Sequence, residues 1–106
     1  MKRTTLTIAA TLIATTYAPH SIAEDVCAPI EGSARATMES RQAGVPLSTS
    51  IRIANDSAVR QSTKDLLTAM VREAYEQPRY STERMQERAI RDFTDDWYMQ
   101  CLKAHD

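Results

Sequence analysis

The chain has 106 residues, a formal net charge of −1 at pH 7, two glycines and two cysteines. This length allows one domain beside a targeting segment. A near-neutral charge argues against a dedicated binder of nucleic acid or of an anionic membrane, because both classes carry an excess of Lys and Arg. Two glycines are too few for a flexible linker.

Residues 1–23 have the pattern of a cleavable signal peptide. Two basic residues are followed by the uncharged, largely apolar stretch 6–14, and small residues stand at Ser21 and Ala23. Cleavage is predicted between Ala23 and Glu24. The sequence therefore predicts a bacterial protein that is periplasmic or secreted.

The alternatives to this assignment are weaker. Cleavage after Ala18 also fits small residues, but it places Pro19 directly after the cut. A membrane-spanning helix needs about 20 mostly apolar residues, and this stretch is shorter and diluted by threonines. We expect a single domain over residues 24–106, with a net charge of −3 after Lys2 and Arg3 are removed, and without stable membrane insertion.

Cys27 and Cys101 are the only cysteines and lie near the two ends of residues 24–106. Their pairing is forced if both oxidise within one molecule, and small exported domains commonly use a disulfide to supplement a small core. A closed loop of about 75 residues restricts the unfolded chain by roughly 4.5 kcal/mol. A redox or metal pair is the alternative, but the cysteines lack Cys-x-x-Cys spacing and the sole histidine after the signal is His105.

The first predicted helix covers about residues 29–43. Pro29 is acceptable in a first turn, and Gly44 followed by Pro46 stands where a helix usually stops.

The next stretch is ambiguous. Leu47, Ile51 and Ile53 alternate as they do in a strand, but no second segment resembles a partner strand. Ser48 can act as an N-cap, so we predict a short helix over about 49–54 and leave an extended conformation of residues 48–54 open.

The third predicted helix is capped by Asp56 or Ser57 and carries an apolar stripe that begins at Val59 and runs to Tyr75. It ends before Pro78, because a residue that precedes proline is disfavoured in helical geometry.

The fourth predicted helix starts at Ser81, with Tyr80 and Met85 placed for a hydrophobic staple. Apolar residues then recur every four positions at Met85, Ala89, Phe93, Trp97 and Cys101. This stripe puts one cysteine on a buried face. The sequence therefore predicts an all-α fold, a small three- to four-helix bundle closed by one disulfide.

Asp92, Asp95 and Asp96 cluster at helical spacing and provide the sole candidate for a divalent ion. Calcium prefers six to eight oxygen ligands, usually from a loop. Arg88 and Arg91 lie one turn away and can neutralise these acids. We therefore expect a solvated, ion-paired face, no metal, no cofactor and no catalytic residues.

Arg79, Tyr80 and Tyr98 form the candidate interaction surface. Tyrosine and arginine are enriched at the energetically dominant positions of protein interfaces. Simple packing at the meeting point of two helices is the alternative.

Residues 24–106 resemble a group of small exported helical proteins of bacteria and phages that have one cysteine pair and no assigned function. Three stretches and the two cysteines carry the resemblance: Cys27, Met38-Glu39-Ser40-Arg41-Gln42-Ala43-Gly44, Ala74-Tyr75-Glu76-Gln77-Pro78-Arg79-Tyr80-Ser81, and Ile90-Arg91-Asp92-Phe93 leading to Cys101. The resemblance implies helices and export.

The leading functional hypothesis is a small exported interaction protein of the inhibitor, immunity, adaptor or accessory-subunit type, with an unknown protein partner and without catalytic activity. A periplasmic acid-activated chaperone is the alternative, because protonation of the 14 acidic residues below about pH 4 leaves a strongly positive chain. A small metal-dependent enzyme is third.

Overall fold

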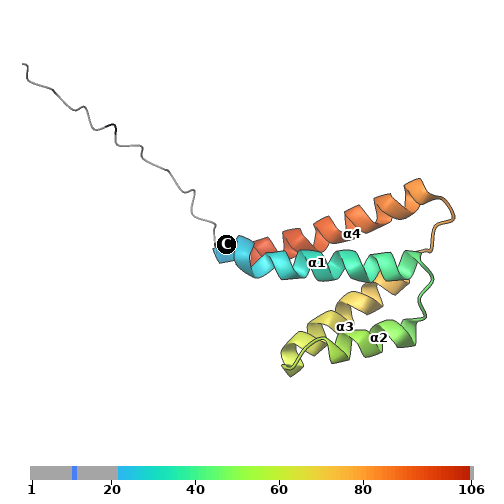
Figure 1. The fold of residues 1–106 in the computed structure, drawn as a ribbon, viewed down its shortest axis with the longest axis horizontal. Helices are drawn as coiled ribbons and strands as arrows, with labels where there is room; N and C mark the ends of the chain where they lie inside the picture. The colour runs from blue at the N-terminus through green and yellow to red at the C-terminus, as the bar shows by residue number, and fades with distance from the viewer. Residues whose placement is uncertain (1–10, 12–21, 106) are drawn as a thin grey trace, which may run out of the picture.

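The computed structural model describes residue 11 and residues 22–105, and within these residues the protein is all-helical with four helices. They are α1 (Ile22–Gln42), α2 (Leu47–Asp56), α3 (Gln61–Glu76) and α4 (Glu83–Ala104). Helices α1 and α4 lie side by side and antiparallel, while α2 and α3 form a hairpin that packs on the other side of α1 (Figure 1). The predicted helical class is confirmed. Most of the predicted signal peptide, residues 1–23, lies outside the described residues.

Helix α1 begins at Ile22, earlier than the predicted residue 29, so Pro29 lies inside the helix and not in its first turn. The predicted stop is confirmed. Gly44 has a φ of +81°, which L side chains rarely adopt. Its N–H donates to the carbonyl of Arg41 (3.1 Å), and the Val45 N–H donates to Ser40 (3.0 Å), which is the Schellman arrangement.

Helix α2 settles the ambiguous stretch as helical, over Leu47–Asp56 and so longer than predicted. The predicted cap at Ser48 is wrong, because the N-cap residue is Pro46, which makes no side-chain capping bond. The carbonyl of Pro46 instead accepts the N–H groups of Thr49 (3.1 Å) and Ser50 (3.2 Å).

Helix α3 starts at Gln61, and the prediction of Asp56 or Ser57 as its cap is wrong. Asp56 is the last residue of α2 and Ser57 its C-cap. Val59 therefore lies in the connecting turn and is 98% exposed, not part of a buried stripe. The helix ends at Glu76, before Pro78 as predicted.

Helix α4 is capped one residue later than predicted. The side chain of Thr82, not Ser81, accepts the N–H of Met85 at 3.3 Å. The prediction of a hydrophobic staple between Tyr80 and Met85 is therefore also wrong by one position, and the Met85 side chain is partly exposed.

The core lies where α1, α3 and α4 meet. Its fully or nearly fully buried apolar residues are Ala34 and Met38 of α1, Met70 and Ala74 of α3, and Phe93 of α4. Ala89 and Trp97, which belong to the apolar stripe predicted for α4, pack against this cluster. The predicted stripe therefore does face the core through most of its length.

The Cys27–Cys101 disulfide is present, with a Cα–Cα distance of 5.7 Å. It joins the first turns of α1 to the last turn of α4, which fixes the antiparallel pair at that end. Cys27 is fully buried and Cys101 is partly exposed. Within the part of the chain that the structure describes, no helix is long and apolar enough to cross a membrane.

Candidate functional site

Arg79 and Tyr80, two residues of the predicted interaction surface, lie in the turn between α3 and α4 and bond to the end of α1. The Arg79 side chain donates from Nε to the main-chain carbonyl of Gln42 at 3.0 Å. Its guanidinium carbon lies 2.8 Å from the position that a Cβ on Gly44 would occupy. Both residues therefore have structural contacts within the chain.

Gln42 is the centre of this turn network, which comprises Gln42, Arg79, Tyr80 and Gln86. Its side chain is 3% exposed. Oε1 accepts the N–H of Tyr80 (2.8 Å), and Nε2 donates to the carbonyl of Pro78 (2.9 Å). Gln86 of α4 donates from Nε2 to the Tyr80 carbonyl at 2.7 Å. The turn that leads into α4 is thus held by side chains of two helices.

Tyr98, the third residue of the predicted surface, is a half-buried residue of α4. It lies fifteen positions after Glu83, the first residue of α4, which is about 22 Å along the helix axis. The structure brings Arg79 and Tyr80 together but leaves Tyr98 near the opposite end of α4.

The acidic cluster of α4 forms one ion pair. Arg88 Nε lies 3.8 Å from Asp92 Oδ2, and both side chains are exposed. Within the described residues no group of three or more His, Cys, Asp or Glu side chains is placed to hold a metal ion. Asp92 and Asp96 line a cleft between α3 and α4, whereas Asp95 does not.

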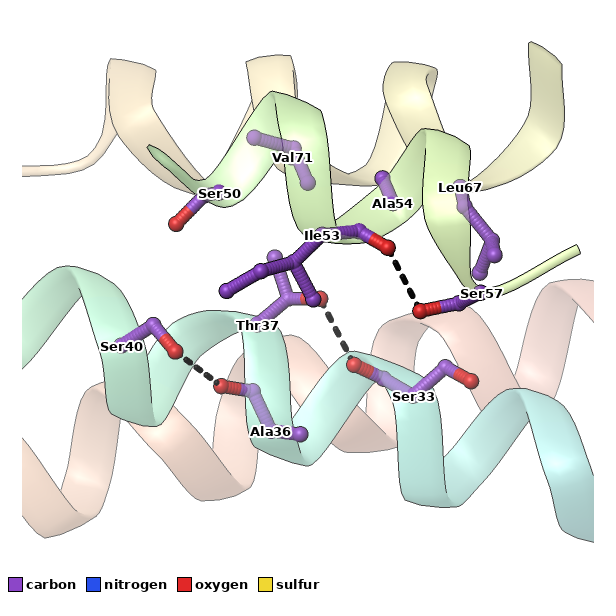
Figure 2. A pocket seen from close by; sticks show the side chains of 10 residues that line it. All are labelled: Ser33, Ala36, Thr37, Ser40, Ser50, Ile53, Ala54, Ser57, Leu67 and Val71. Atoms are coloured by element: carbon purple, nitrogen blue, oxygen red, sulfur yellow. Dashed lines mark hydrogen bonds between the residues drawn. The ribbon is translucent and has the colours of Figure 1, made fainter. Parts of the chain in front are cut away.

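A first cleft lies between α1, α2 and α3 and has a volume of about 150 Å³ (Figure 2). Its polar side chains are largely satisfied by their own helices. Thr37 donates to the Ser33 carbonyl at 2.7 Å, and Ser57 donates to the Ile53 carbonyl at 2.6 Å. The side chain of Ile53 lies over Thr37 in the middle of the cleft. This cleft offers few free hydrogen-bond donors and little depth.

A second cleft, with a volume of about 360 Å³, lies beside the disulfide. Its apolar wall comes from three helices: Val26 and Ile30 of α1, Leu66 of α3 and Trp97 of α4. We call these four residues the apolar cleft. Val26 is 42% exposed and Leu66 is 38% exposed, so large apolar side chains from separate helices meet water at one place.

Trp97 has an unusual position in this cleft. The centroid of its ring lies 6.4 Å from the centroid of the Phe93 ring. Trp97 therefore connects the cleft to the core. Its Nε1 is buried and has no hydrogen-bond partner among the described residues.

A third cleft, of about 270 Å³, continues along the α3–α4 interface toward the turn network. Its acidic residues are Glu73 of α3 and Asp92 and Asp96 of α4. We call these three residues the acidic cleft. Asp96, which lines the acidic cleft, directly precedes Trp97, which lines the apolar cleft, in α4.

No protein-family model, curated protein or solved structure matches the chain.

Sequence reasoning missed the apolar cleft for an identifiable reason. Leu66 and Trp97 belong to regular apolar stripes, and a stripe does not indicate which of its members a neighbouring helix covers. The available signal was the width of the stripe on α3, because both Leu66 and Leu67 belong to it. Leu67 faces the α1/α2 side and Leu66 the α4 side.

Proposed function

We propose that this chain is a small extracytoplasmic binding protein that recognises another protein through the apolar cleft. The observation that supports the proposal is the convergence of Val26, Ile30, Leu66 and Trp97 from three helices on one open cleft beside the disulfide. Isolated exposed apolar residues are ordinary, but apolar side chains gathered at one place are characteristic of interaction sites. An aromatic anchor such as Trp97 is typical of their centres.

The extracytoplasmic part of the proposal rests on two features. Residues 1–23 have the signal-peptide pattern, and the Cys27–Cys101 disulfide persists in oxidising compartments. An inhibitor, immunity factor, adaptor or accessory subunit fits this description.

A pair of matched substitutions tests the proposal. Leu66→Asn places a polar amide in the apolar cleft, whereas Val59→Asn makes a similar polar substitution at a residue that is 98% exposed and does not line this cleft. Each tagged variant is crosslinked in the envelope fraction of its own host, and the captured partner is quantified by mass spectrometry.

We expect Leu66→Asn to reduce recovery of the partner by at least about tenfold, which corresponds to about 1.4 kcal/mol, while Val59→Asn leaves it unchanged. Circular dichroism and the mass of the oxidised protein establish that both variants fold. Equal recovery by the two variants contradicts the apolar cleft as the binding surface.

A further inference from the structure

The apolar and acidic clefts both lie along α4, and we call the two together the α3/α4 groove. The α4 residues that line it extend from Met85 to Ala104. They recur at three- and four-residue steps, so they occupy one face of the helix. Helices α1 and α4 pack closely along their length, whereas α3 packs mainly on α1 and α2. The groove is therefore open on the side where a further helix would complete a bundle.

The dimensions of the groove suit a helix. Nineteen positions separate Met85 from Ala104, and at 1.5 Å per residue the lining face of α4 is about 28 Å long. A helix of about 18 residues has the same length. Helices pack at interaxial distances of 8–10 Å, so a docked helix needs a groove with apolar walls on both sides, as Leu66 and Trp97 provide.

The charges of the groove select the partner. Within the described residues, Arg88 is the one arginine or lysine that lines the acidic cleft, and it pairs with Asp92 at 3.8 Å. Glu73 of α3 and Asp96 of α4 also line this cleft and leave an excess of negative charge there. A partner with Lys or Arg at this position gains attraction, and one with Asp or Glu meets repulsion.

We propose that the α3/α4 groove binds a cationic amphipathic helix of a partner protein. The apolar face of that helix contacts Leu66 and Trp97, and its Lys or Arg residues contact Glu73 and Asp96. This inference rests on the proposed function and names the chemistry of the partner. Leu66 of the apolar cleft and Glu73 of the acidic cleft are seven residues apart on α3, so the cationic residues of the partner lie about two turns from its apolar anchor.

Trp97 is the sole tryptophan of the chain and lies in the groove, so its fluorescence reports occupancy directly. The probes are two helical peptides of about 18 residues without tryptophan. Both have leucine at the same positions of one face, and the polar face carries lysine in one peptide and glutamate in the other. Titration of the oxidised protein, with residues 1–23 removed, gives the Kd for each peptide at low and high salt.

We expect the lysine peptide to bind at least about tenfold more tightly than the glutamate peptide, with a difference that shrinks as salt is raised. Glu73→Gln combined with Asp96→Asn weakens binding of the lysine peptide about three- to tenfold. The control combines Glu39→Gln with Glu87→Gln, which removes the same charge from exposed residues outside the groove. It leaves the Kd unchanged.

Three results overturn the inference. If the control variant weakens binding as much as the groove variant, the attraction is a property of net charge and not of this groove. If both peptides bind equally and Leu66→Asn abolishes binding of both, the apolar cleft still binds protein and only the cationic assignment is wrong. If sedimentation shows a dimer that Leu66→Asn dissociates while neither peptide binds, the occupant is a second copy of this chain.

Discussion

Replacement of Gln42 by methionine provides a direct test of the turn network. Methionine keeps the length and much of the volume of the glutamine side chain, but it replaces the weak hydrogen bond from Gln42 Nε2 to Met38 Sδ (3.5 Å) by an apolar contact. It removes the bonds from Gln42 to the Tyr80 N–H and to the Pro78 carbonyl. Two lost hydrogen bonds contribute about 0.5–1.5 kcal/mol each, and a donor left without a partner adds a cost of its own. We expect a total loss of about 2–4 kcal/mol in the free energy of unfolding.

This loss is a large fraction of the stability of a domain of this size, which is about 4–12 kcal/mol. Urea denaturation of the oxidised protein, followed by circular dichroism, measures it as a change in midpoint at constant slope. The comparison variant is Gln86→Met, which removes the single bond to the Tyr80 carbonyl and should cost about 0.5–1.5 kcal/mol. Equal losses for the two variants would refute the central role of Gln42.

Two further predictions concern glycine and the disulfide. Gly44→Ala should destabilise the protein by about 1–3 kcal/mol, because it forces a positive φ on alanine and a contact with Arg79. Gly32→Ala should stabilise the protein by about 0.5–1 kcal/mol, since a Cβ on this helical glycine meets nothing within 4 Å. If thermal unfolding shows that the two glycine variants change the stability in the same direction, this reasoning is contradicted. Replacement of Cys27 and Cys101 by alanine should lower the free energy of unfolding by about 2–4 kcal/mol, because the disulfide closes a separation of 74 residues. An unchanged denaturation midpoint would show that the disulfide does not limit stability.

The stops of α1 and α3 were predictable from single residues. Gly44 and Pro78 act through local backbone geometry, which is the same in any fold. The starts were not predictable, because several polar residues near each start are competent to cap. Ser48, Asp56 and Ser81 all fit the preference for N-caps, yet the structure uses none of them in that role.

The α3/α4 groove and the turn network were hidden from sequence reasoning for a shared physical reason. Both depend on which residues of separate helices come together, and Gln42 is 38 positions from Tyr80. No periodicity connects such residues. The disulfide was an exception, since two cysteines in one chain leave a single pairing.

The placement of these features separates residues that stabilise the fold from residues available for binding. The stretch 38–44 and the stretch 74–81 meet in the turn network at one end of the α1/α4 pair. The disulfide holds the other end. Leu66, Glu73 and Asp96, the groove residues proposed for binding, take no part in the turn network or in the disulfide. The residues proposed for binding are therefore distinct from the residues that hold the two ends of the α1/α4 pair.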